Sequence, residues 1–289
     1  MDLNEDGEQD ILSGSYSRME REMAGLFQVL WGKLGHQFKD AAVLKGTDSE
    51  PLIIPIKSKD EQLENICTRP WAVDWNGDGK LDLVVGNFGG TFYVFEGQGK
   101  GKFAPKPEPL MAGGGGRLKI NGHHSDPFVV DWDNDGDLDL LSGSEQGGVQ
   151  WAENTAGAGK VPALKPFEAL IPPGAKFETG QLVKETELTG PTSATRVWIE
   201  DVNGDGKLDI LVGDRVTLVS IAKGLSKKSY DQKLEQWKKA WDDASNASSD
   251  ANVKDPEAAQ KRRNELYQQR TKFMTEDSTG YVWLYKRKT

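Results

Sequence analysis

Four short segments of the chain carry oxygen-bearing side chains at the same spacing. They begin at Asp2, Asp74, Asp131 and Asp201, and each follows the pattern D-x-[DN]-x-D-G-x-x-D. Oxygen ligands at positions 1, 3, 5 and 9, with the backbone carbonyl of position 7, can surround a hard cation, and glycine at position 6 permits a sharp turn. Because every ligand is an oxygen atom, the set favours Ca²⁺ over softer metals.

Each loop has its own predicted ligand set, made of side-chain oxygens and, in three loops, one carbonyl. The sets are Asp2, Asn4, Asp6 and Asp10; Asp74, Asn76, Asp78 and Asp82 with the Lys80 carbonyl; Asp131, Asp133, Asp135 and Asp139 with the Asp137 carbonyl; and Asp201, Asn203, Asp205 and Asp209 with the Lys207 carbonyl. The third loop supplies four carboxylates and the others three, so we expect it to attract a cation most strongly. The first loop has no preceding strand to hold it. We therefore expect up to four Ca²⁺ ions, with three well-formed sites.

Other calcium-binding loops fit the sequence less well. An EF-hand requires a glutamate at position 12 and helices on both sides, whereas the equivalent residues are Ser13, Val85, Ser142 and Val212. A dockerin-type loop would continue into a helix, but Leu83–Gly86 has the composition of a strand. Thrombospondin-type repeats need regular cysteines, and Cys67 is the single cysteine of the chain.

The residues around the loops repeat as well, and they indicate the elements that must position them. A large aromatic residue lies three positions before three of the loops, and each loop is followed by a short apolar run that ends in glycine. Such runs between turn residues are typical of buried strands. The aromatic residues are Trp71, Phe128 and Trp198, and the runs are Ile11–Gly14, Leu83–Gly86, Leu140–Gly143 and Ile210–Gly213.

Further strands are predicted after each of these runs. Third strands are expected at Gly25–Leu30, Thr91–Phe95, Val149–Ala152 and Tyr281–Tyr285, and fourth strands near Phe38–Leu44, Phe103–Leu110 and Phe167–Ile171. Four short antiparallel strands per repeat form the blade of a propeller, and one blade cannot bury its apolar faces alone. The predicted fold is all-β: a β-propeller, or an arc of one, with about four four-stranded blades.

We predict a single domain over residues 1–289, with repeats at roughly 1–60, 61–115, 116–185 and 186–289. The first repeat lacks most of its first strand, and the last one ends after its third. Exposed strand edges invite pairing, so we expect them to be covered by each other, by a partner chain or by further blades. Because residue 1 already lies inside a repeat, we expect any export signal to lie upstream.

Residues 226–276 interrupt the last repeat between its second and third strands. The segment is rich in Lys, Glu, Gln and Ala, and Tyr230, Leu234, Trp237 and Trp241 follow helical spacing. Asp255-Pro256 is typical of the turn between two helices. We predict an inserted α-helical hairpin. Its aromatic stripe would either pack the two helices together or dock a partner.

The repeats resemble the FG-GAP/VCBS family, which forms the blades of integrin α-chain propellers and of many bacterial exported proteins. Residues Asp131–Gly143 carry the resemblance most closely. It implies calcium in the loop between the first two strands of a blade, and adhesion or binding of proteins or glycans. It also implies an extracellular, cell-surface or periplasmic location. The helical insertion, the incomplete first repeat and the presence of four repeats, where integrin propellers have seven, depart from the family pattern.

Composition argues against several other functions. The net charge is −9, and no basic block occurs beyond Lys286–Lys288, so nothing favours nucleic acid as a partner. No apolar run approaches the roughly 20 residues of a membrane-spanning helix. A single cysteine allows neither an intramolecular disulfide nor a cysteine-based metal site.

One polar cluster could support a ligand site. His123, His124 and Asp126 precede the first strand of the third repeat, and Arg69 and Arg196 align with them in neighbouring repeats. If these segments converge, they would suit an anionic ligand; the alternative is hydrogen bonding between blades. No catalytic motif is recognisable. The sequence therefore predicts a non-catalytic interaction or adhesion propeller, part of a larger protein, with a carbohydrate-active enzyme (a polysaccharide lyase or hydrolase) as the alternative.

Overall fold

The computed structural model describes residues 1–16, 25–56, 59–249 and 255–288, and these divide into two compact units. The first, here called the sheet unit, comprises Met1–Gly174, Gly190–Asp214 and Tyr281–Thr289. The second, the insertion unit, comprises Ala175–Thr189 and Arg215–Gly280. Among the described residues, no helix is long and apolar enough to cross a membrane.

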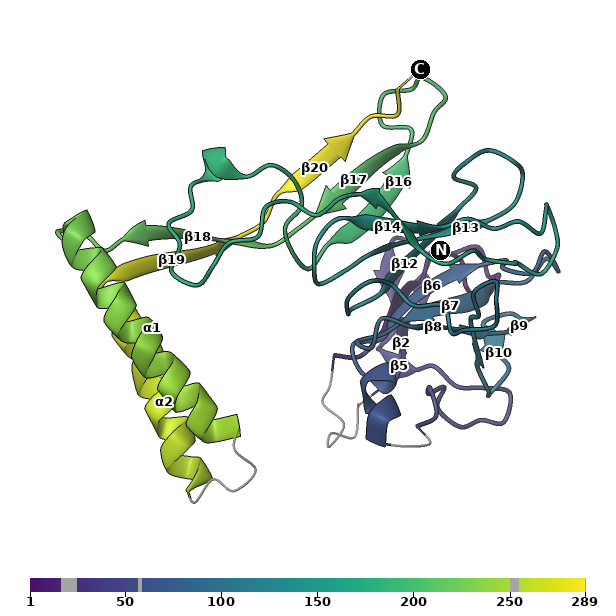
Figure 1. Cartoon of the computed structure of the whole chain (residues 1–289). Helices are drawn as coiled ribbons and strands as arrows, with labels where there is room; N and C mark the ends of the chain where they lie inside the picture. The colour runs from purple at the N-terminus through teal and green to yellow at the C-terminus, as the bar shows by residue number, and fades with distance from the viewer. Residues whose placement is uncertain (17–24, 57–58, 250–254, 289) are drawn as a thin grey trace. The chain divides into compact units, whose positions relative to one another are not determined.

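The sheet unit contains four small antiparallel sheets that follow one another along the chain (Figure 1). Their strands, in spatial order, are β1 (Ile11–Ser13), β2 (Gln28–Leu30) and β5 (Ala42–Val43); β6 (Arg69–Val73), β7 (Asp82–Gly86), β8 (Phe92–Phe95) and β11 (Glu108–Pro109); β12 (Asp126–Val130), β13 (Asp139–Gly143), β14 (Val149–Ala152) and β15 (Glu168–Ile171); and β16 (Arg196–Glu200), β17 (Asp209–Gly213) and β20 (Val282–Tyr285). Each sheet is a meander, as in a propeller blade.

Shorter elements complete the sheet unit. They are the paired strands β3 (Gly32–Lys33) and β4 (Gln37–Phe38), the paired strands β9 (Gly97–Gly99) and β10 (Lys102–Phe103), and the 3₁₀ helix η1 (Lys59–Asn65). The predicted strands are confirmed, including a first sheet without a first strand and a last sheet without a fourth. The fold is mostly β, with several sheets of the propeller type. The predicted repeat boundaries remain predictions.

Both faces of the central strands are buried, which explains their unbroken apolar sequences. Side chains of a strand alternate between faces. Leu83 and Val85 of β7 therefore pack in the core shared with the first sheet, while Val84 packs in the core shared with the third. Likewise Leu140 faces the second sheet and Leu141 the fourth. The second and third sheets thus each contribute to two cores, and a fully buried side chain of this size contributes about 1.5–3 kcal/mol.

A hydroxyl group joins each sheet to the next. Ser125 is fully buried and precedes β12; its Oγ accepts the Asn87 N–H (2.8 Å) and donates to the Thr91 carbonyl (2.8 Å) of the second sheet. Thr195 Oγ1 accepts the Ser144 N–H in the same way (2.8 Å). Thr68 Oγ1 accepts the Ser15 N–H (2.9 Å). We call this contact the hydroxyl clasp.

The clasp requires glycine at the end of the preceding strand. A Cβ atom on Gly86 would lie 2.4 Å from the Ser125 carbonyl oxygen, and one on Gly143 would lie 2.3 Å from that of Thr195. Both distances are shorter than van der Waals contact, so the glycine that ends each apolar run permits close approach of the next sheet. Gly213, at the end of β17, has no such neighbour: its nearest atom is Arg196 Cβ at 4.0 Å.

The larger part of the insertion unit, Arg215–Gly280, lies in the chain between β17 and β20, and its smaller part, Ala175–Thr189, precedes β16. The ribbon of β18 (Val216–Ile221) and β19 (Met274–Thr279) leads to α1 (Lys227–Ser249) and α2 (Pro256–Arg270), which lie side by side (Figure 1). A short 3₁₀ helix, η2 (Glu185–Glu187), precedes β16. Two helices were expected here, whereas the ribbon was not. Residues 250–254, within the predicted turn, lie outside the described residues.

The aromatic stripe of the insertion packs its own core. Tyr230 and Trp237 are buried with Leu266 and Phe273, and Trp237 Nε1 donates to the Leu266 carbonyl of the other helix (2.7 Å). The N-terminus of α2 is capped by Asp255, whose side chain accepts the Ala258 N–H (2.9 Å). The stripe thus joins the helices, as the first of the two interpretations predicts.

We expect Ser125→Ala to lower the free energy of unfolding by about 1–3 kcal/mol, because the Asn87 N–H loses its acceptor in a buried position. Ser125→Thr should be tolerated, since threonine performs this role at positions 68 and 195. Urea unfolding followed by tryptophan fluorescence measures both. Equal stability of Ser125→Ala and the unmodified protein would contradict the clasp.

Candidate metal centre

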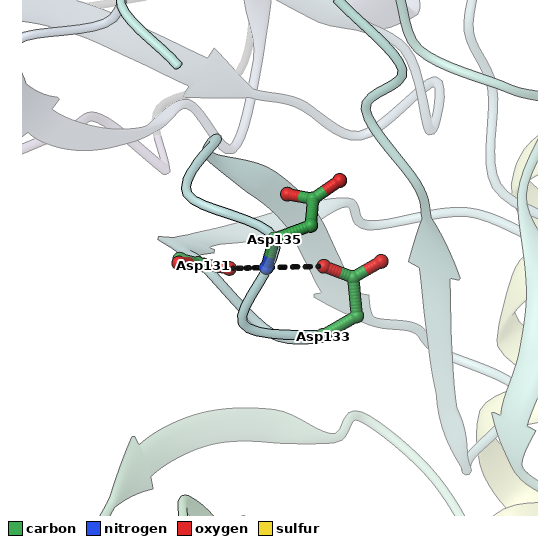
Figure 2. A group of neighbouring side chains, drawn as sticks. All are labelled: Asp131, Asp133 and Asp135. Carbon is green, nitrogen blue, oxygen red and sulfur yellow. Dashed lines mark hydrogen bonds between the residues drawn. The ribbon is translucent and has the colours of Figure 1, made fainter. Parts of the chain in front are cut away.

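The four aspartate loops share one hydrogen-bonding scheme. In the third loop the Asp135 N–H donates to Asp131 Oδ1 (3.1 Å) and to Asp133 Oδ1 (3.2 Å), as Figure 2 shows. The Gly136 N–H donates to Asp131 Oδ2 (3.1 Å), and the Asp137 N–H to Asp135 Oδ1 (3.1 Å). Backbone amides therefore hold the side chains at positions 1, 3 and 5 inside the turn.

The other loops repeat these bonds. The N–H of position 5 donates to the side chains of positions 1 and 3, and the N–H of position 6 to position 1. In the first, second and fourth loops the position-5 donors are Asp6, Asp78 and Asp205, with distances of 2.9–3.0 Å. The same local sequence thus produces the same turn four times.

The third loop brings three carboxylates together. One oxygen each of Asp131, Asp133 and Asp135 lies within 4.8 Å of the other two. Two like charges 4 Å apart repel by about 1 kcal/mol in water and about 4 kcal/mol at a protein surface. Accordingly the pKa of Asp133 is raised, first by burial and then by the charge of Asp135. No lysine or arginine among the described residues forms an ion pair with these carboxylates, so the cluster could hold a metal ion.

The other loops partly satisfy their own carboxylates. The second oxygen of position 5 accepts a side-chain hydrogen bond in each: from Asn4 to Asp6 (3.0 Å), from Lys80 to Asp78 (3.3 Å) and from Asn203 to Asp205 (3.1 Å). In the third loop, position 3 is Asp133, which cannot donate when ionised. The third loop therefore has the strongest need for a cation.

Position 7 of the third loop adds a buried acceptor. The Asp137 side chain accepts the Gly157 N–H (2.7 Å), but its Oδ1 is buried without a hydrogen-bond partner. Burial raises the pKa of Asp137, and the charges of Asp135 and Asp133 raise it further. From the sequence we expected a ligand only from the carbonyl of this residue. Lys80 and Lys207 occupy the same position in the second and fourth loops.

The aspartate at position 9 serves the fold directly. Asp139 is fully buried, and its oxygens accept the Trp132 N–H (3.1 Å) and the Asn154 N–H (2.7 Å), which connects the start of the loop to the residues after β14. Burial raises its pKa to about 6, although both amides oppose the shift. It lies outside the three converging carboxylates. Sequence reasoning missed this role, although position 9 is the first residue of a largely buried strand in the second, third and fourth repeats.

The equivalent aspartates behave alike. Asp10 accepts the Leu3 and Gly32 N–H groups (both 2.8 Å), and Asp82 accepts those of Trp75 (3.1 Å) and Gly97 (2.6 Å). Asp209 accepts the Arg287 N–H (3.0 Å), while its Oδ2 is buried without a partner. Asp10 and Asp82, like Asp139, thus use both oxygens to connect the start of a loop with residues beyond the next strand.

The second predicted site contains two kinds of contact. Arg69 Nε lies 3.6 Å from Asp126 Oδ1, and Arg196 Nε lies 3.3 Å from Asp126 Oδ2. The rings of His123 and His124 contact Phe88, with ring centroids 5.8 and 4.4 Å from it. Burial lowers the pKa of His124, and the nearby charges of Arg69 and Arg196 lower it further, so the histidine lies near both arginines. The two arginines and the aspartate therefore come together, and the histidines pack against an aromatic ring.

Comparison with known families supports the repeat. A family model described as "FG-GAP-like repeat" matches residues 74–142 and 131–212. Residues 74–212 of the chain belong to the FG-GAP-like repeat family. The matches begin at Asp74 and Asp131, the first residues of the second and third loops, so they cover three of the four aspartate loops. No curated protein sequence matches the chain. FG-GAP-like repeats indicate a non-catalytic domain of the propeller type.

The position-9 aspartate and the carboxylate cluster should respond differently to substitution. Without divalent cations, Asp139→Asn should lower the free energy of unfolding by about 1.5–3 kcal/mol. The reason is that the buried N–H groups of Trp132 and Asn154 lose their charged acceptor. Asp133→Asn should leave the free energy of unfolding unchanged or raise it, because it removes repulsion from the cluster. Urea unfolding in excess chelator measures both. Equal losses in the two variants would contradict this division.

Proposed function

We propose that the chain is a calcium-stabilised, non-catalytic interaction propeller that works outside the cytoplasm. The observation that carries the proposal is the convergence of Asp131, Asp133 and Asp135, three carboxylates without a cationic partner among the described residues. An ion of charge +2 would turn their mutual repulsion into attraction. The family supports the same choice, since FG-GAP-like repeats often bind Ca²⁺.

The donor set of the third loop fits Ca²⁺. Calcium takes six to eight oxygen ligands at 2.3–2.6 Å and tolerates irregular geometry. Asp131, Asp133 and Asp135 would supply carboxylate oxygens, and Asp137 its carbonyl, with water completing the shell. Backbone amides already fix both oxygens of Asp131 and one oxygen each of Asp133 and Asp135. The second and fourth loops offer similar sets, and binding there would have to displace the bonds from Lys80 and Asn203.

Bound calcium would hold the turn between the first two strands of a blade. Ligands that bind only the folded state stabilise it by mass action. At a dissociation constant of about 10⁻⁴ M, typical of extracellular calcium modules, 10 mM Ca²⁺ adds about 2.7 kcal/mol. A site of this affinity would be largely filled at millimolar calcium, the concentration typical outside the cytoplasm. The family, typically extracellular, supports such a location.

Calcium should raise the melting temperature of the protein, and a chelator should lower it. We expect Asp135→Ala to remove most of the increment that belongs to the third loop, and Mg²⁺ to replace Ca²⁺ poorly because it demands stricter octahedral geometry. Differential scanning calorimetry in 10 mM Ca²⁺, in 10 mM Mg²⁺ and in chelator measures this.

Asp40→Ala is the matched control, because Asp40 is exposed and lies outside the loops. It should retain the full calcium response. Identical melting curves in calcium and in chelator would overturn the proposal.

A further inference from the structure

We propose that a hollow lined by Arg69 and Arg196 binds the carboxylate of an acidic sugar. The hollow has a volume of about 350 Å³ and lies where residues of and next to β1, β6, β12 and β16 meet, all within the sheet unit. Such a volume is in the range of small-molecule sites. Its polar lining includes Ser13, Ser15, Tyr16, Thr68 and Asp126.

The two arginines form an incomplete ion-pair network. Asp126 forms an ion pair with each guanidinium group, at 3.6 Å from Arg69 Nε and 3.3 Å from Arg196 Nε. Each arginine also donates one Nη1 hydrogen bond to a backbone carbonyl, of Ser125 (3.2 Å) and Thr195 (3.1 Å). A guanidinium has five N–H donors, so these contacts leave donors available on both residues. Two positive charges face one negative charge, in a chain whose net charge is −9.

The ion-pair network carries a net positive charge, because Asp126 is the one carboxylate among the described residues that pairs with the two arginines. The pKa of Arg69 is lowered by burial and by the nearby charge of Arg196. A second carboxylate would balance the charge, and arginine binds carboxylates with two parallel hydrogen bonds. Arg196 is the better placed of the two, because its side chain is 47% exposed and that of Arg69 is 17% exposed.

Aromatic side chains favour a sugar as the carrier of the carboxylate: Tyr16 lines the hollow, and three more lie on the strands that supply its charged residues. Trp71, Phe128 and Trp198 follow Arg69, Asp126 and Arg196 by two residues, and alternation along a strand puts them on the same faces. The Phe128 ring centroid lies 4.3 Å from that of Trp71 and 5.5 Å from that of Trp198. Trp198 is 52% exposed, and Tyr16 at the hollow is 78% exposed. Exposed aromatic rings can stack on the apolar face of a pyranose, whereas a peptide terminus or inorganic phosphate has no such face.

This inference names a ligand class for the interaction function proposed above, and it rests on that function only in requiring a binding activity. The residues differ from those of the aspartate loops. Binding and calcium dependence can therefore be measured separately on the same protein.

Isothermal titration calorimetry of the full chain tests the site with three probes. Tri-galacturonate should bind, and its methyl-esterified form, which keeps the sugar but lacks the charge, should bind at least about tenfold more weakly. An acetylated tripeptide with a free C-terminal carboxylate should also bind more weakly than tri-galacturonate, because it offers no pyranose to Trp198.

Variants make the test sharper. Arg196→Gln should weaken tri-galacturonate binding about tenfold. Asp126→Asn should tighten it several-fold, because it removes the competing carboxylate while keeping the shape of the side chain. Arg262→Gln, which changes an exposed arginine of α2, is the matched control and should have no effect. If Arg196→Gln fails to fold, Asp126→Asn still decides, since a purely structural ion pair predicts no gain in affinity.

Several outcomes would overturn the site. They are no binding of tri-galacturonate by a protein that still melts in a calcium-dependent way, equal binding of the methyl ester, tighter binding of the tripeptide, or weaker binding by Asp126→Asn. Binding that persists without any calcium effect on melting would instead refute the calcium proposal and leave this site standing.

Discussion

The buried carboxylate at position 9 of each repeat is the interaction on which both the sheets and the loops depend. A charged group is costly to bury unless hydrogen bonds compensate for the lost water. At Asp139 the compensation comes from two backbone amides, one at the start of the loop and one after β14. The bonds therefore form only when the loop and the third strand are both in place. Local turn and sheet are thereby coupled.

This arrangement divides the loop into two parts. The amides of positions 5 to 7 orient the carboxylates of positions 1, 3 and 5, and these remain near the surface, where an ion can reach them. Position 9 stays in the interior. A cation at the outer part would tighten a turn that the inner part already defines, so the ion would strengthen the fold without having to create it. The hollow lined by Arg69 and Arg196 contains no residue of the aspartate loops.

Much of the fold could be predicted from the sequence, because the strands of each repeat are indicated by its local pattern of apolar and turn residues. Leu83–Gly86 and Leu140–Gly143 are continuous apolar runs between turn residues, and both are buried strands. The ribbon of β18 and β19 was not predictable, since Met274–Thr279 is mostly polar and its pairing depends on residues far away in the chain. The packing of His124 against Phe88 was equally hidden, because Phe88 lies in an earlier repeat of the chain. The hydroxyl clasp did leave a signal, a serine or threonine six residues before three of the loops.

A Cβ atom on Gly213 would meet no backbone of a further sheet among the described residues. This bears on how the number of repeats in such proteins can change. Every clasp connects a sheet only with its immediate neighbour, so no repeat carries information about its rank in the series. Gain or loss of one repeat by recombination would leave every remaining junction chemically intact, as in other architectures with nearest-neighbour stability. The glycine that ends each apolar run then helps to make repeats interchangeable, since it leaves room for the backbone of whichever sheet comes next.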